Sequence, residues 1–411
     1  MSLTKNKIIN DPIYGFISIR FPLIWQLIEH PFIQRLRRVS QLGLSSLVFP
    51  GANHSRFHHA IGAMHLMDKA IITLKSKGHE ITKKEHEASL IAILLHDVGH
   101  GPFSHALENS IVNNLNHEKI SLMYMYKLND IFDKKLSTAI EIFTKKYRKK
   151  FLNQLVSSQI DVDRMDYLNR DSFYSGVNEG IISSDRIISM LNVFNNELVV
   201  DYKGLYSVEK FVIARKLMYW QVYLHKTVLS AEHTLMQILK RAKKLFQINY
   251  GLFCPPDFEF FLDKKEVIDE KFFNERNALT HFSKIDDTDI ISCLKCWANS
   301  DDKVLKILSN CIINRNLLKI KTVEKNIKKN ELLVIRKLIK EQYKLSNDEV
   351  DYLVFPIEIE NLTYNTLEQE IKFLKSDNKI IKFSDVKGEI NMDMRNSKIS
   401  KYYICHPEFK K

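Results

Sequence analysis

The stretch Leu94–His105 reads LLHDVGHGPFSH and places three histidines and an aspartate around two glycines, directly after an apolar run. Histidine is concentrated in this part of the chain, because eleven of the fifteen histidines occur at or before residue 117. Several lie in apolar segments with helical spacing, where a buried imidazole without a partner costs free energy. Since a divalent cation is an efficient partner for imidazole nitrogens, this stretch predicts a metal site.

Two pairs of side chains form the candidate metal site. His96 and Asp97 are adjacent at the end of the apolar run. His59 lies on the preceding expected helix, in SRFHHA, and Asp163 lies on a later element, in QIDVDRMDYLNRD. Two imidazoles and two carboxylates suit Fe, Mn, Zn or Mg and leave coordination positions open for water.

Longer motifs surround these residues: QRLRRVSQLG, FPGANHSRFHHAIG, LLHDVGHGPFSHALE and DVDRMDYLNRDS. Together they resemble the HD-domain metal-dependent phosphohydrolase superfamily, in the dNTP triphosphohydrolase-like branch that contains the SAM-and-HD-domain enzymes and bacterial dGTPases. The resemblance runs from about residue 11 to about residue 174 and continues more weakly to about residue 233. It implies one divalent metal ion held by His59, His96, Asp97 and Asp163. His58 and Asp161 are the neighbouring alternatives to His59 and Asp163.

The resemblance also implies a catalytic set of His100, Glu108 and His117. His117 would protonate the leaving oxygen as a general acid, and direct attack by this histidine is the alternative. Glu108 stands where the similar enzymes usually have Asp, and its alternative is an exposed helix residue. Arg56 lies one helical turn before His59 and can fork onto phosphate oxygens, with a surface salt bridge as its alternative.

A further set of residues is implied to face the substrate. Tyr167 would exclude a 2′-hydroxyl, and Gln41 and Asp171 would bind the 3′-hydroxyl. Tyr219 and Trp220 stand where polar or basic residues are usual, which leaves the triphosphate specificity open. The implied substrate-binding residues are Arg56, Gln41, His105, Arg164, Tyr167, Asp171, Arg215 and Tyr223.

Composition adds weaker constraints. The formal net charge of +12 favours anionic ligands, although the lysine excess is interleaved with Asn and Ile as an AT-rich genome would also produce. Five cysteines do not predict a disulfide framework, and the C-x-x-C formed by Cys293 and Cys296 is interpreted as helix positions rather than a metal or redox site. No signal peptide and no apolar run of about 20 residues is visible, so we expect a cytoplasmic protein without a membrane segment.

Periodicity predicts a mainly α-helical fold with a small N-terminal hairpin and a smaller α+β C-terminal region. Residues 7–20 are expected to form the hairpin, residues 23–190 helices, and residues 195–208 a second hairpin that turns at Lys203 and Gly204. A long helix is expected from 208 to about 246, further helices from 252 to 344, and strands within 352–360, 379–386 and 398–406. We therefore expect a phosphohydrolase core in residues 1–250 and a C-terminal region of unassigned role in residues 251–411.

Three functions are compatible with these residues. The first is hydrolysis of a dNTP to deoxynucleoside and triphosphate, by a homo-oligomer in analogy with the similar enzymes. The second is hydrolysis of another nucleotide or phosphomonoester at the same site. The third is a nucleotide- or nucleic-acid-binding regulator with little turnover, although nucleic acid is not the expected partner.

Overall fold

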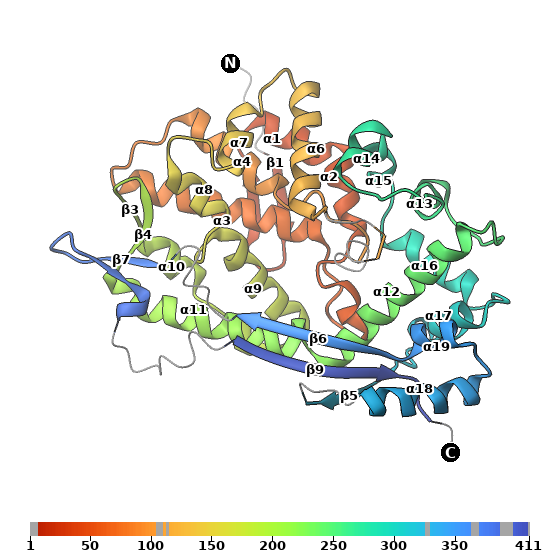
Figure 1. Cartoon of the computed structure of the whole chain (residues 1–411). Helices are drawn as coiled ribbons and strands as arrows, with labels where there is room; N and C mark the ends of the chain where they lie inside the picture. Colours follow the sequence, from red (N-terminus) through yellow and green to blue (C-terminus); the bar gives the residue numbers. More distant parts are fainter. Residues whose placement is uncertain are drawn as a thin grey trace.

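The computed structural model describes residues 7–103, 110–111, 115–324, 329–362, 370–386 and 398–409. Helices form most of it, and long strands run beneath the helices in the C-terminal part (Figure 1). The predicted fold class is confirmed: a mainly α-helical core, a small N-terminal hairpin and a smaller α+β C-terminal region. Within the described ranges, no helix is both long enough and apolar enough to cross a bilayer.

The first half of the chain is a hairpin followed by helices. Its elements are β1 (Lys7–Asp11), β2 (Gly15–Ile19), α1 (Pro22–Glu29), α2 (Pro31–Gln34), α3 (Arg56–Ser76), α4 (Lys83–Leu95), α6 (His117–Ile131), α7 (Ser137–Phe143), α8 (Lys150–Val156), α9 (Val162–Ser175) and α10 (Ser184–Met190).

Helices α3 and α4 form the centre of this half. Both are buried on nearly every side, and a helix that is apolar all round must be enclosed by other elements. α3 packs against both α4 and α9. A capping box between Thr82 and Glu85 fixes where α4 begins, and Gly78, with φ of 89°, follows the last turn of α3 as a helix-ending glycine.

Helices α3 and α9 approach closely at Gly62. A Cβ atom at this position would overlap with the side chains of Asp166 and Arg170 on α9. These two residues form a fully buried, two-point ion pair, with 2.9 Å between Arg170 Nε and Asp166 Oδ2 and 2.9 Å between Nη2 and Oδ1. Arg170 also binds Asp11 of β1. The glycine therefore lets this ion-pair network lie directly against α3.

The second half mixes helices and strands. Its elements are β3 (Leu191–Phe194), β4 (Glu197–Asp201), α11 (Leu205–Met218), α12 (Lys226–Phe246), α13 (Pro256–Leu262), α14 (Glu270–Glu275), α15 (Ala278–Phe282), α16 (Asp287–Trp297), α17 (Lys303–Ile313), β5 (Lys319–Val323), α18 (Lys329–Tyr343), α19 (Asn347–Leu353), β6 (Phe355–Leu362), β7 (Lys372–Leu374), β8 (Ile380–Lys382) and β9 (Lys398–His406).

The strands form two sheets besides the N-terminal hairpin. One has the order β3-β4-β7-β8, in which β7 runs parallel to β4 and Phe373 is the partner of Val200. In the other, β9 lies between β5 and β6. The division of the chain near residue 250 stays a prediction, and strands from both sides of that position share the first sheet.

Three details differ from the expectations. The second hairpin turns at Asn195 and Asn196, not at Lys203 and Gly204, because both asparagines adopt the positive φ (49° and 64°) that a two-residue turn requires. The expected long helix is interrupted by a π-helical turn, Tyr219–Tyr223, between α11 and α12. β5 forms where helix was expected, because pairing with β9 supplies its backbone hydrogen bonds.

The C-x-x-C segment lies in α16, where helix was expected. Cys293 is buried, and its Sγ lies 4.0 Å from Sγ of Cys254, whereas Cys296 is exposed. The two thiols of the segment therefore have different surroundings.

Candidate active site

Three of the four predicted metal ligands meet where α3, α4 and α9 come together. His59 Nε2 lies 3.1 Å from Asp163 Oδ1, and His96 Nε2 lies 3.4 Å from the same oxygen. Ligands that each lie ~2.1 Å from one cation at right angles are about 3 Å apart, so these separations suit a shared ion. Both Nε2 atoms are buried and have no hydrogen-bond partner among the described residues.

The other nitrogen of each imidazole is held by a group that can only accept. His59 Nδ1 donates to Asp166 Oδ2 at 2.8 Å, and His96 Nδ1 donates to the carbonyl oxygen of Ile93 at 2.7 Å. The protons therefore reside on Nδ1, and the lone pairs on Nε2 face Asp163. Donor sets held in this way from behind are typical of metal sites, and the residues present fit a divalent cation.

Electrostatics couple the members of this cluster. Burial lowers the pKa of His59, but the nearby carboxylates of Asp163 and Asp166 outweigh burial and raise it to about 10. Burial raises the pKa of Asp163, but the adjacent His59 and His96 imidazoles hold it well below its usual value. A cation would replace the protons that the carboxylates otherwise attract to the imidazoles.

Asp97, the fourth predicted ligand, lies between this cluster and a second one. Its Oδ1 is 3.4 Å from His96 Nε2 and 3.5 Å from His100 Nε2. Its Oδ2 is 2.5 Å from Nη1 of Arg56, which is buried at the start of α3. The ligand atoms of Asp97, His100 and His117 all lie within 4.8 Å of one another. Asp97 therefore links the metal cluster to the predicted catalytic histidines.

The rings of His100 and His117 are stacked, with 3.8 Å between their centroids and 15° between their planes. His117 begins α6, and Gly99 lets that helix come close, because a Cβ atom at Gly99 would overlap with the backbone of His117 and Ser121. The Gly99 amide also donates to Ser121 Oγ at 2.9 Å. The glycine of the HDVGH motif is thus what allows the two histidines to meet.

The two alternative ligands have other contacts. The Ser55 amide and hydroxyl lie 3.2 and 3.0 Å from His58 Nδ1, so His58 belongs to the start of α3. Asp161 caps α9, where it accepts from the Arg164 amide and pairs with the Arg164 guanidinium. Neither residue belongs to the clusters described above.

Two predicted substrate residues, Tyr223 and Tyr167, lie next to a third, Asp171. Its Oδ1 lies 2.7 Å from His54 Nε2, and its Oδ2 accepts from the Tyr223 hydroxyl at 2.8 Å. The Tyr167 ring stands edge-on to Tyr223 at 6.1 Å. Arg215 donates to Gln159 Oε1 at 3.0 Å. His54 and Gln159 were not predicted from the sequence.

Three other predicted residues are placed less fully. The backbone amide of Gln41 donates to the carbonyl oxygen of His54 at 3.0 Å. The side-chain Oε1 of Gln41 is buried and has no hydrogen-bond partner in the described part of the chain. His105 and Glu108 lie outside the described residues.

Sequence reasoning missed the residues that support the ligands from behind. Asp166 and Arg170 were inside the quoted motif, and their spacing of four on one helix was the available signal for a pair. His54 also lay inside a quoted motif, but nothing local indicated that it would contact Asp171, which is 117 residues away along the chain.

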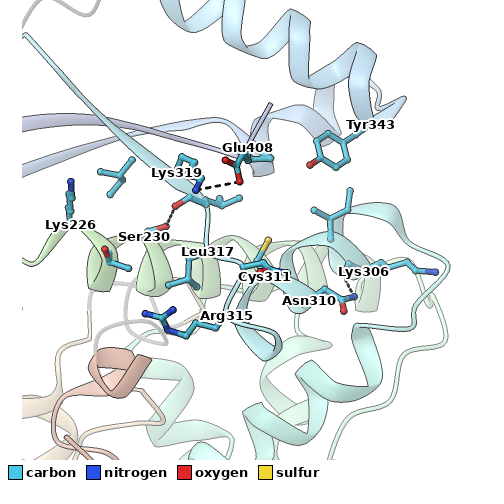
Figure 2. A pocket seen from close by; sticks show the side chains of 16 residues that line it. Lys226, Ser230, Lys306, Asn310, Cys311, Arg315, Leu317, Lys319, Tyr343 and Glu408 are labelled. Carbon is cyan, nitrogen blue, oxygen red and sulfur yellow. Dashed lines mark hydrogen bonds and ion pairs between the residues drawn. The ribbon is translucent and has the colours of Figure 1, made fainter. Parts of the chain in front are cut away.

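A separate basic pocket of about 770 Å³ lies between α12, α17, β5 and the C-terminal residues (Figure 2). Lys226, Lys306, Arg315 and Lys319 contribute its positive charge, and Glu408 pairs with Lys319 at 3.4 Å. None of the residues predicted to bind metal or substrate lines it.

Comparisons with known proteins agree with this geometry. The HD domain matches residues 56–171, and the HD-associated region matches residues 182–249. The chain is 34% identical over 347 residues to the protein YwfO of Bacillus subtilis, and this alignment covers 82% of this chain and 77% of YwfO. It is 32% identical over 278 residues to the deoxynucleoside triphosphate triphosphohydrolase SAMHD1 homolog of Dictyostelium discoideum, covering 62% of this chain and 53% of that protein.

Among solved structures, a phosphohydrolase from Bacteroides thetaiotaomicron superposes with a TM-score of 0.95 at 45% sequence identity, covering 98% of this chain and 100% of that one. The motif order, the clustered ligands and these similarities agree. The chain belongs to the HD-domain metal-dependent phosphohydrolase superfamily.

Proposed function

We propose that the protein hydrolyses dNTPs to deoxynucleoside and triphosphate. The observation that carries the proposal is the pair of adjoining clusters, in which His59, His96 and Asp163 lie beside the stacked His100 and His117. A binding module needs no proton donor next to a metal site, so the second cluster favours turnover.

His59, His96 and Asp163 would hold one divalent cation, with Asp97 adjoining. When bound, the cation would offset charge on a phosphate oxygen and lower the pKa of a water molecule. Asp166 and the Ile93 carbonyl orient the two imidazoles. Arg56 holds Asp97 and adds a buried positive charge, which favours an anionic substrate.

A water molecule would form the new bond to the α-phosphorus and lose a proton, and His117 would donate its proton to the 5′-oxygen as the bond between that oxygen and phosphorus breaks. The stacked ring of His100 fixes the plane of His117, and Asp97 Oδ1 lies 3.5 Å from His100 Nε2. These contacts limit the directions in which the donating nitrogen can point. Limited motion of this kind is how an active site lowers the entropic part of a barrier.

The aromatic group around Asp171 supports a deoxyribose-containing substrate. The Asp171 carboxylate contacts His54 and Tyr223, one through each oxygen, and each oxygen has a second lone pair with which to accept a 3′-hydroxyl. Tyr167 would lie against the face of the sugar and leave no room for a 2′-hydroxyl.

One observation favours the second function, hydrolysis of another nucleotide or phosphomonoester. Arg215 donates to Gln159, and its guanidinium carbon lies 5.8 Å from the ring of Tyr219, so a phosphate-facing cation is partly engaged by the protein. A substrate with a shorter phosphate chain needs fewer such cations.

The deciding experiment incubates purified protein and Mn²⁺ with dNTPs, NTPs and nucleoside monophosphates, and identifies each product by ion-exchange chromatography. We expect equal amounts of deoxynucleoside and triphosphate, and loss of both in His96→Ala and Asp97→Ala. His58→Ala, next to a ligand but outside the cluster, is the control and should remain active. Release of orthophosphate alone would favour the second function. No turnover together with salt-sensitive RNA or DNA binding would favour a regulator.

A further inference from the structure

We infer that Asp287, in the first turn of α16, is a positioning residue for this reaction. It would hold the segment that carries Gln41 and the loop Val98–Phe103, here called the His100 loop, in one fixed arrangement. The inference rests on the proposed function, because it is that function which assigns a role to both segments.

The Asp287 carboxylate bridges two backbone amides that are far apart in the sequence. Oδ2 accepts from the Ser40 amide at 2.8 Å, and Oδ1 accepts from the Phe103 amide at 2.8 Å. Ser40 directly precedes Gln41 and forms a β-bridge with Ser55, which directly precedes Arg56. One buried side chain therefore connects the His100 loop with the entry to α3.

The His100 loop needs such support because its backbone is strained at Phe103. This residue has φ of 47°, a left-handed conformation that costs free energy for a residue other than glycine. Arg35, which is fully buried, donates to the carbonyl oxygens of Val98 and His100 at 2.9 and 2.8 Å and to that of Ile285 at 3.2 Å. Asp287 thus binds one end of the loop directly, and Arg35, which also donates to Ile285 just before α16, binds the rest of it.

Capping of α16 does not account for Asp287. The N-cap is Asp286, whose side chain accepts from the Thr288 amide and forms a capping box with Asp289. Asp286 also binds Arg38 at 2.5 Å. The oxygens of Asp287 accept instead from residues outside the helix, and carboxylate bonds to amides are among the stronger hydrogen bonds.

The test compares Asp287→Ala and Asp287→Asn with Asp302→Ala. Asp302 is the matched control, because it is a buried aspartate at the N-terminus of α17 that binds the Leu305 amide and Arg241. We expect Asp287→Ala to lower kcat about ten- to a hundredfold with the metal content unchanged. Asp287→Asn, which keeps one accepting oxygen, should be intermediate. Asp302→Ala should lower the melting temperature as much and leave kcat unchanged.

A second readout does not depend on the substrate. Hydrogen–deuterium exchange in the peptide that covers residues 98–103 should accelerate in Asp287→Ala and not in Asp302→Ala. If wild-type protein releases no triphosphate from any dNTP, the proposed function fails. The positioning role of Asp287 can then still be tested by hydrogen–deuterium exchange in residues 98–103 and by the turnover of a generic phosphodiester. Wild-type exchange and wild-type kcat in Asp287→Ala would overturn the inference.

Discussion

His59 Nδ1 donates to Asp166 Oδ2 at 2.8 Å, and this bond turns Nε2 of the same ring toward Asp163. Asp166 is itself fully buried and held by Arg170. The ligand cluster therefore depends on a carboxylate that belongs to no cluster of candidate ligands.

Replacement of Asp166 by Asn should weaken metal binding about ten- to a hundredfold, because the amide cannot accept from both His59 and Arg170 with two oxygens. Metal retained after dialysis against a series of chelator concentrations measures the change. Asp68→Asn is the matched control, since Asp68 Oδ1 lies 2.8 Å from His86 Nε2 in a histidine–aspartate pair outside the site. Equal metal retention in Asp166→Asn and wild type would contradict the supporting role.

Replacement of Tyr223 by Phe removes the hydroxyl that holds Asp171. A hydrogen bond to a carboxylate of this kind corresponds to about a tenfold effect, so KM for a dNTP should rise about tenfold at nearly constant kcat. Steady-state kinetics check this. Tyr219→Phe, on the same π-helical turn, should leave KM unchanged, and equal KM values in the two variants would argue against substrate binding by Asp171.

Replacement of Gly62 by Ala places a methyl group against the Asp166–Arg170 ion pair. Overpacking against two fully buried charged groups should cost about 2 kcal/mol or more in the free energy of unfolding. Urea denaturation measures it. Gly251→Ala is the control and should leave the free energy of unfolding nearly unchanged, because a Cβ atom there meets no neighbour within 4 Å. An equally small effect of Gly62→Ala would show that α3 and α9 can move apart without a loss of stability.

Two glutamates on α4 should contribute to the stability of the fold with opposite dependence on pH. Burial raises the pKa of Glu85, but Lys149 and hydrogen bonds from Thr82 and Tyr147 outweigh it and lower the pKa to about 2. Its stabilising contribution is present above the unfolded value near 4.5 and is lost as the pH falls toward 2. Glu85→Gln should therefore lower the melting temperature at pH 7, by a difference that shrinks between pH 4.5 and pH 2.

Glu87, on the same helix, has a pKa that is shifted in the opposite direction. Burial raises its pKa, so the charged form is disfavoured in the folded state at neutral pH. Glu87→Gln should then leave the melting temperature at pH 7 unchanged or raise it. Scanning calorimetry from pH 2 to pH 7 compares both variants with wild type, and parallel curves for the two variants would refute this assignment.

The cluster of candidate metal ligands could be predicted because its members lie in continuous motifs. His59, His96 and Asp163 each lie beside apolar helical sequence that fixes their depth in the fold, and the structure brings their ligand atoms together. The stacking of His117 on His100 was not predictable, because it depends on how α6 packs against Gly99.

The other differences have similar causes. A two-residue turn at Asn195 and Asn196 competes with a Lys-Gly turn of similar local propensity, and the pairing of β3 with β4 decides between them. The π-helical turn at Tyr219–Tyr223 leaves apolar periodicity nearly intact and is set by packing. Asp287 had no sequence signal at all, since its partners lie 184 and 247 residues away.

The bond from Phe103 to Asp287 also sets an order of events during synthesis. The ribosome adds about 5–20 residues per second, so the 184 residues between the two correspond to roughly 10–40 s of translation. In the later part of that interval, once Asp163 has been made, the nascent chain carries all the candidate ligands without the aspartate that secures the His100 loop. The proposed metal site of a newly made molecule should therefore form late, and chaperone contact and metal loading should be sought near the end of translation.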